Sequence, residues 1–302
     1  MRIRIAAAAA LLGVSTLSAC NASGGPTGGS STIPVAASIN AWGSILAQLG
    51  GDRVQETSLV SNPNTDPHSY EPTPADGRTI AIAQLFVENG IGYDAWADQA
   101  LAASPNSSRL VVNVGALVGV GDGGNPHRWY SPSDVERVAD AITTDLKKID
   151  PNDAAYFDAQ RAAFEANGLA TYHALISEIR AKYAGVKVGA SESIVTPLAD
   201  ALGLDLVTPP AFLKAISEGT DPSPSDKSTV DAQIASHEIK VFVFNSQNST
   251  PDVAAEVTAA KAAGIPVVAV TETLTPATAT FQSWQVAQLR ALASALHEAT
   301  GR

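Results

Sequence analysis

Basic residues, histidine and long apolar segments are all scarce in this sequence. Nineteen lysines and arginines stand against 30 acidic residues, and the net charge is −11. This balance argues against a nucleic acid partner, because the phosphate backbone is itself anionic. Beyond the N-terminal segment, no apolar run reaches the ~18–20 residues that a membrane-spanning helix needs. The sequence contains only five histidines, so each can be considered separately as a candidate functional residue.

The chain has a single cysteine, Cys20, at the end of its N-terminal segment. Arg2 and Arg4 precede an apolar run over residues 5–14, and Leu-Ser-Ala comes directly before the cysteine. This order is typical of a secretory signal peptide at residues 1–19. Leu-Ser-Ala-Cys also resembles the bacterial lipobox, whose cysteine becomes the lipidated first residue of the mature chain. The alternative is an ordinary signal peptide with an incidental cysteine, which would leave a thiol without a disulfide partner.

A flexible tether and two lobes are predicted after the signal peptide. Residues 20–32 are rich in glycine and serine, which predicts a solvated linker. About 270 residues remain, enough for a large core and two lobes. Loss of residues 1–19 removes two arginines and no acid, so the net charge becomes about −13, which suits a cation ligand. We place the N-terminal lobe at residues 33–149 and the C-terminal lobe at residues 185–302.

A long helical segment separates the predicted lobes. Asp150 and Pro151 form a helix start, and apolar residues then recur at helical spacing with almost no breaker except Gly168. An unbroken helix of this length would extend ~50 Å, which exceeds one lobe. We therefore interpret residues 150–184 as a connecting helix. The sequence also allows two helices broken at Gly168.

Short strands alternate with helices on both sides of this segment. The predicted strands are residues 33–38, 54–60, 85–88, 110–114, 186–190, 204–207, 239–244 and 266–270. Such alternation predicts an α/β fold in which each lobe is a mostly parallel sheet flanked by helices. Residues 209–225 are expected to be mostly loop, followed by a helix that Ser225 or Asp226 caps.

Two histidines occupy similar frames bounded by prolines. Residues 66–72 read Asp-Pro-His-Ser-Tyr-Glu-Pro, and residues 125–132 read Asn-Pro-His-Arg-Trp-Tyr-Ser-Pro. Proline restricts the backbone, so each histidine is presented on a stiff loop. One loop histidine is as readily structural as functional. The repetition of the frame favours a shared function for His68 and His127.

Two acidic residues complete a candidate metal site. In parallel α/β sheets, ligands bind outside the carboxyl ends of the strands. His68, Glu192 and Glu272 each follow a predicted strand, and His127 lies in a loop after another. Two imidazoles and two carboxylates suit a divalent transition metal. Four protein ligands leave little room for a catalytic water, so no catalysis is expected.

With these motifs, residues 33–298 resemble the substrate-binding lipoproteins of zinc and manganese ABC transporters. The resemblance implies two α/β lobes joined by one rigid helix. It also places Glu192 and Glu272 at the family's third and fourth ligand positions, although the fourth is usually an aspartate. The implied function is an extracytoplasmic receptor, anchored to the bacterial cell membrane through Cys20. We expect a monomer that captures Zn²⁺ or Mn²⁺, with Fe²⁺ as a further candidate, and delivers it to a membrane permease.

Two other functions stay open from the residues alone. A secreted metallohydrolase could use the two histidines and one glutamate as ligands and the other glutamate as general base. The sequence contains no His-Glu-x-x-His motif to support this. An adhesion lipoprotein could use the same fold without transport. His173, His237 and His297 are interpreted as surface or packing residues.

Overall fold

The computed structural model describes residues 32–302 except residues 66–69 and residue 249. Residues 32–302 form one compact unit. The predicted signal peptide, the tether up to residue 31 and Cys20 lie outside the described residues, and so does His68. The account below concerns the described part of the chain.

The N-terminal lobe is built on a four-stranded parallel sheet. Its strands are β1 (Ile33–Ile39), β2 (Val54–Val60), β3 (Leu85–Glu88) and β4 (Leu110–Asn113), in the order β2-β1-β3-β4. Every residue of β3 is buried, and so is nearly all of β1. Central strands with this pattern are covered by helices on both faces. The predicted sheet of the first lobe is confirmed.

The helices of this lobe lie in the connections between its strands or follow β4. They are α1 (Asn40–Gly50), η1 (Gly51–Arg53), α2 (Pro74–Ile82), α3 (Ala95–Ala103), α4 (Val114–Val118), η3 (Arg128–Tyr130) and α5 (Pro132–Ile149). Thr73 and Asp76 begin α2 with reciprocal side-chain to backbone hydrogen bonds. The short helix α4 was not predicted. It begins where the Asn113 side chain accepts a hydrogen bond from the backbone N–H of Ala116 at 2.9 Å.

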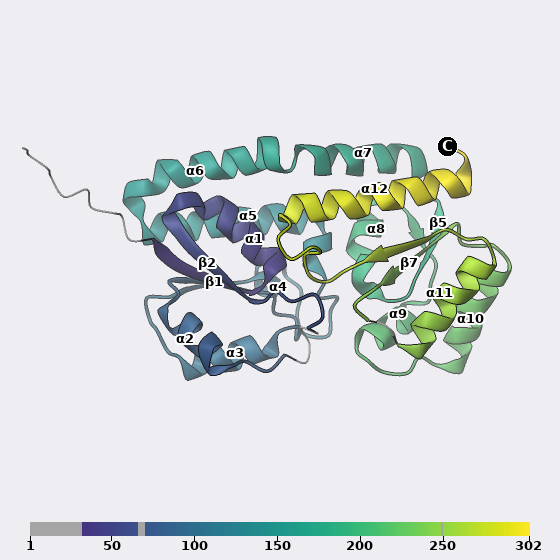
Figure 1. Ribbon diagram of the computed structural model, residues 1–302, viewed down its shortest axis with the longest axis horizontal. Coiled ribbons are helices and arrows are strands. Elements are labelled where there is room, and N and C mark those ends of the chain that lie inside the picture. The colour runs from purple at the N-terminus through teal and green to yellow at the C-terminus, as the bar shows by residue number, and fades with distance from the viewer. Residues whose placement is uncertain (1–31, 66–69, 249) are drawn as a thin grey trace, which may run out of the picture. The chain divides into compact units, whose positions relative to one another are not determined.

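The C-terminal lobe repeats the same strand order. Its strands are β5 (Lys187–Ala190), β6 (Asp205–Leu206), β7 (Val241–Asn245) and β8 (Val267–Val270), all parallel, in the order β6-β5-β7-β8. Its helices are η6 (Ser193–Val195), α8 (Thr196–Leu202), α9 (Pro210–Ser217), α10 (Pro224–Ala235), α11 (Pro251–Ala262) and α12 (Phe281–Thr300). Figure 1 shows both sheets with their flanking helices.

Two predictions in the C-terminal lobe were wrong. Residues 210–217, expected to be loop, form α9, in which Phe212, Leu213 and Ile216 are buried. Proline is well suited to the first position of a helix, so the Pro209-Pro210 pair starts α9 and does not prevent it. The next helix begins at Pro224, and its cap is Ser223, whose side chain accepts from the backbone N–H of Asp226.

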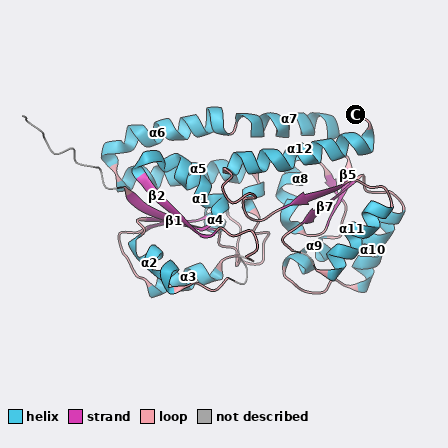
Figure 2. Ribbon diagram, viewed as in Figure 1, coloured by secondary structure: helices cyan, strands magenta, loops and turns pink. Residues whose placement is uncertain are grey.

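The connecting segment is helical throughout most of its length but changes its hydrogen-bonding pattern once. After η4 (Pro151–Asp153), α6 (Ala154–Ala163) leads into a π-helical turn, η5 (Phe164–Gly168), and then into α7 (Ala170–Tyr183). The backbone N–H of Leu169 donates to the carbonyl of Phe164 at 2.8 Å, five residues back. Figure 2 shows α6 and α7 following one another along one side of the two sheets. The irregularity at Gly168 is thus a wide turn within one helical path.

One large apolar cluster extends through both lobes. It includes Trp42 and Trp129 from the first half of the chain and Leu198 and Trp284 from the second. A smaller cluster lies in the second lobe, around Phe212 and Phe242. Because the lobes share buried side chains, large movements between them would expose apolar surface. Within the described residues, none of the helices combines the length and the apolar character required to cross a membrane.

Candidate metal centre

Three of the four predicted ligands come together in the folded chain. Ligand atoms of His127, Glu192 and Glu272 all lie within 4.8 Å of one another. Their side chains are almost completely buried, with exposed fractions of 1%, 1% and 6%. His68, the fourth predicted ligand, belongs to the residues that the structure does not describe. Ligation of a metal by these four residues stays a prediction.

Each of the three residues is placed by the end of a regular element. Glu192 follows β5 in an extended conformation, directly before the helical turn η6. Glu272 follows β8, which is separated from β5 by β7 in the sheet. His127 precedes the turn η3 in the first lobe. The carboxyl ends of parallel strands meet at one edge, which explains why two glutamates 80 positions apart in the sequence share a site.

The imidazole of His127 is oriented by its neighbour Asn125. The Asn125 side-chain oxygen lies 2.9 Å from Nδ1 of His127 and accepts the backbone N–H of His127 at 3.0 Å. An amide oxygen can only accept, so Nδ1 carries the hydrogen and the ring lone pair lies on Nε2. The rings of Trp129 and Tyr93 pack against the imidazole, with centroid distances of 5.4 and 6.2 Å. The ring therefore has one defined tautomer and orientation.

The two carboxylates share a single amide donor. Asn245 Nδ2, at the end of β7, donates to Oε1 of Glu192 and to Oε1 of Glu272, both at 2.7 Å. Asn248 Nδ2 donates to the other oxygen of Glu192 at 2.7 Å, and the hydroxyl of Tyr93 donates to the other oxygen of Glu272 at 2.8 Å. Buried carboxylates require such donors or a cation, because burial strongly disfavours isolated charge.

The negative potential of the cluster also acts on Tyr130. Burial raises the pKa of the Tyr130 hydroxyl, and the charges of Glu272 and Glu192 raise it further, against the hydrogen bonds with Gln288 and Thr271. The same field attracts a divalent cation. One imidazole nitrogen and two carboxylates form a mixed N/O donor set, which fits Mn²⁺, Fe²⁺ or Zn²⁺.

The amide and hydroxyl groups around the ligands were not predicted from the sequence. Asn245 follows the same strand-end rule as the two glutamates and could have been found by it. Tyr93 and Asn248 lie in loops without such a signal. Gln247 was missed as well: its side-chain oxygen accepts the backbone N–H groups of Glu272 and Thr273 at 2.6 and 3.0 Å. Gln247 thus holds the backbone of the loop that carries Glu272.

A second group of potential ligands has a different character. Glu136, Glu165 and His173 lie close together and are partly exposed. Arg161 pairs with both glutamates, at 2.5 Å to Glu136 and 3.2 Å to Glu165. Burial raises the pKa of Glu136 to about 7, and the hydrogen bond with Glu165 raises it as well, while Arg161 lowers it. A guanidinium between the carboxylates takes the place that a cation would need, so this group is an ion-pair network.

The fold and the cluster together define a two-lobed α/β binding protein with a candidate centre for a divalent cation. The family model described as "Zinc-uptake complex component A periplasmic" matches residues 35–295. The chain therefore belongs to this family, and the resemblance seen in the sequence motifs is confirmed. The family's relatives are named as binding proteins, in agreement with the expectation of a protein that is not an enzyme.

Curated relatives match parts of the chain. The manganese-binding lipoprotein MntA of Halalkalibacterium halodurans is 28% identical over 138 residues, which cover 44% of this chain and 45% of the relative. The metal ABC transporter substrate-binding lipoprotein SsaB of Streptococcus sanguinis is 29% identical over 167 residues, or 51% of this chain and 54% of the relative. The chain thus spans about half the length of the curated relatives that it matches.

Solved structures share the fold over most of the chain. A Mn-bound periplasmic metal-binding protein (S38A mutant) from Candidatus Liberibacter asiaticus superposes with a TM-score of 0.73 at 21% identity, covering 87% of this chain and 98% of the other. The protein FpvC of Pseudomonas aeruginosa, in complex with Mn²⁺, has a TM-score of 0.71 at 22% identity and covers 88% and 99%. The predicted fold class, two lobes with parallel sheets flanked by helices, is confirmed.

Proposed function

We propose that this protein captures a divalent transition-metal ion between its two lobes and delivers it to the permease of an ABC transporter. The observation that carries the proposal is the buried group of His127, Glu192 and Glu272, whose ligand atoms lie within 4.8 Å of one another. Buried acids at this spacing are stabilised strongly by a cation that neutralises them. Family membership supports the same function.

The cargo belongs to the group Zn²⁺, Mn²⁺ and Fe²⁺. Relatives of the chain are named for zinc, manganese and iron. Two carboxylates in the donor set suit Mn²⁺ and Fe²⁺, whereas Zn²⁺ binds most N/O sites more tightly than Mn²⁺ does. His68 is proposed as the fourth ligand, because its motif repeats the frame of His127.

The location and organisation of the chain belong to the same proposal. A lipid on Cys20 would anchor the protein to the outer side of the cell membrane, with residues 20–32 as the tether. The lobes are placed at residues 33–149 and 185–302, with residues 150–184 as the connecting helix, and the protein is proposed to act as a monomer. Relatives named as lipoproteins support the anchor.

Metal titration of the chelator-treated protein tests the proposed function. Zn²⁺, Mn²⁺ and Fe²⁺ are added separately, and bound metal per chain and thermal stability are measured. We expect one ion per chain and an increase of about 2.7 kcal/mol in the free energy of unfolding at a free metal concentration 100 times the Kd. His127→Ala, Glu192→Ala and His68→Ala should each weaken binding at least tenfold. His173→Ala is the matched control, since His173 belongs to the ion-pair network. Undiminished binding in His127→Ala would contradict the proposed site.

A further inference from the structure

Asn125 lies at the boundary between two cavities of the cleft between the lobes. One cavity of about 300 Å³ is lined by Tyr93 and Pro126 on one side and by Ser193, Lys214 and Ser217 on the other. A second cavity of about 620 Å³ is lined by residues of α5, α7 and α8 and of the segment that precedes α5. Asn125 lines both cavities. Asn125 therefore lies between the two cavities.

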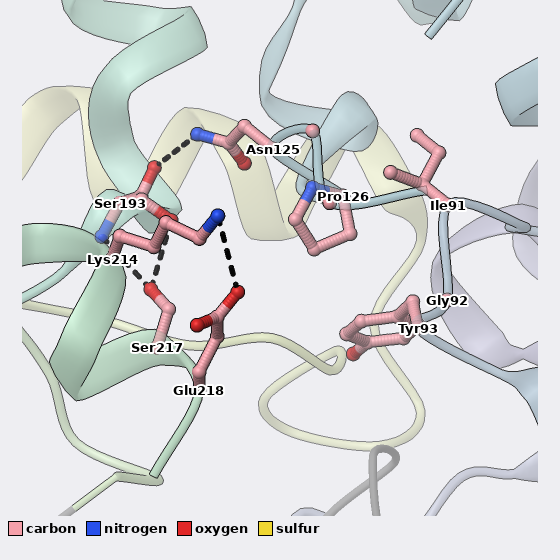
Figure 3. A pocket seen from close by; sticks show the side chains of 11 residues that line it. Ile91, Gly92, Tyr93, Asn125, Pro126, Ser193, Lys214, Ser217 and Glu218 are labelled. Atoms are coloured by element: carbon pink, nitrogen blue, oxygen red, sulfur yellow. Dashed lines mark hydrogen bonds and ion pairs between the residues drawn. The ribbon is translucent and has the colours of Figure 1, made fainter. Parts of the chain in front are cut away.

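The Asn125 amide connects the two lobes directly. Its Nδ2 donates to the backbone carbonyl of Ser193 at 2.7 Å, across 68 positions of sequence. Figure 3 shows this hydrogen bond reaching from the loop of the first lobe to the turn of the second. Ser193 is held in turn by Ser217 of α9, whose hydroxyl accepts the Ser193 N–H at 3.1 Å and lies 2.8 Å from its hydroxyl. The acceptor for Asn125 is thus a fixed point of the second lobe.

The same amide sets the state of His127. Its oxygen accepts the backbone N–H of His127 and the Nδ1 hydrogen, at 3.0 and 2.9 Å. The amide cannot be reversed, because its nitrogen would then face a backbone N–H, and its oxygen would face a carbonyl. Ser193 directly follows Glu192 in the chain. One side chain therefore touches the residue that bears a nitrogen ligand in one lobe and the neighbour of a carboxylate ligand in the other.

We propose that Asn125 is a positioning residue that couples closure of the lobes to the geometry of the metal centre. With the lobes closed, the bond to Ser193 holds the amide plane, and the amide oxygen holds the imidazole with Nε2 towards the two glutamates. When the lobes separate at Ser193, the amide is released and the imidazole loses its fixed orientation. Opening of the cleft thereby weakens the centre, which suits release of the ion. This inference rests on the proposed function.

Two variants separate the two contacts of Asn125. Asn125→Ala removes both. Asn125→Asp keeps an oxygen that accepts from His127 but has no hydrogen to donate to Ser193. Ser133→Ala is the matched control, because Ser133 lines the same cleft and its hydroxyl lies 3.3 Å from that of Ser131, within one lobe.

The first measurement is hydrogen exchange in the metal-free protein. Backbone amides of residues 193–195 should exchange roughly three- to tenfold faster in Asn125→Ala and Asn125→Asp than in the wild type, in line with the loss of one hydrogen bond. Ser133→Ala should exchange at the wild-type rate. Unchanged exchange in both Asn125 variants would show that the Asn125–Ser193 hydrogen bond does not hold the lobes together, whether or not the protein binds metal.

The second measurement uses Co²⁺ as a spectroscopic substitute for the cargo. Asn125→Ala should change the visible absorption of the Co²⁺ complex and release Co²⁺ to a chelator roughly tenfold faster, because the imidazole is no longer oriented. Asn125→Asp keeps an acceptor for His127 but lacks the bond to Ser193 that holds the side-chain plane, so it should also release Co²⁺ faster than the wild type. An unchanged spectrum and release rate in Asn125→Ala would overturn the coupling. Failure of the wild type to bind Co²⁺, Zn²⁺, Mn²⁺ or Fe²⁺ would instead overturn the proposed function. The hydrogen-exchange result would then still test whether the Asn125–Ser193 bond connects the lobes.

Discussion

Replacement of Asn245 by alanine should destabilise the metal-free protein more than its small change in volume suggests. The side chain is fully buried, and its nitrogen donates to both Glu192 and Glu272 at 2.7 Å. Hydrogen bonds to charged groups contribute about 1.5–3 kcal/mol each. Loss of the two bonds therefore lowers the free energy of unfolding by about 3 kcal/mol or more. A domain of this size loses about 2–4 °C in Tm per kcal/mol, so Tm should fall by about 6–12 °C.

The bound ion should remove part of this deficit. A cation between the carboxylates replaces the electrostatic stabilisation that the Asn245 N–H groups give by hydrogen bonding in the metal-free protein. The difference in Tm between wild type and Asn245→Ala should thus be smaller with saturating metal than with excess chelator. This comparison separates an electrostatic function of Asn245 from simple loss of packing, which metal would not compensate.

Thermal and urea denaturation, each with chelator and with metal, are the assays. Asn106→Ala is the control, because Asn106 is only partly buried and its side chain accepts hydrogen bonds from the backbone N–H and the hydroxyl of nearby Ser108. Its stability should stay within about 0.5 kcal/mol of the wild type. The reasoning is refuted if Asn245→Ala is as stable as Asn106→Ala in chelator, or if metal leaves the deficit unchanged.

Two further predictions concern charged groups away from the centre. Burial, together with the smaller effects of the Asp252 and Asp231 charges, raises the pKa of Glu256 to about 8. A carboxyl with a raised folded-state pKa loses stability as pH rises from its ordinary value near 4.5 towards 8, so Glu256→Gln should stabilise the protein by about 1–2 kcal/mol at pH 8 and by little at pH 5. Equal effects in urea denaturation at both pH values would contradict this. Arg128→Ala should destabilise by about 3 kcal/mol, because it leaves the buried Asp134 carboxylate without its guanidinium partner; a loss below about 1 kcal/mol in the same assay would count against that pairing.

Local patterns in the sequence predicted most of the regular elements. β2 and β3 were predicted with the bounds that the structure has, because apolar and β-branched runs of strand length lie between turn residues. The helix α9 was missed in a segment that begins with two adjacent prolines, Pro209 and Pro210. Proline restricts the residue before it but favours the first turn of a helix, and the sequence does not say which effect prevails. The π-helical turn ends at Gly168, where a Cβ would lie 3.3 Å from the Phe164 ring, and a linear apolar pattern does not contain this close approach.

The candidate centre was only partly contained in the sequence. The sequence by itself indicated the candidate ligands: His127, Glu192 and Glu272 stand at element ends, and parallel strands direct such ends to one edge. The tertiary structure alone decided how these groups are held. Tyr93 donates a hydrogen bond to Glu272 across 179 positions of sequence. The hydrogen bonds that the Asn245 and Asn125 amides donate likewise depend on which loops lie next to one another in the folded chain. Strand periodicity is a local property of the chain, whereas a hydrogen bond between distant loops exists only once the lobes have packed together.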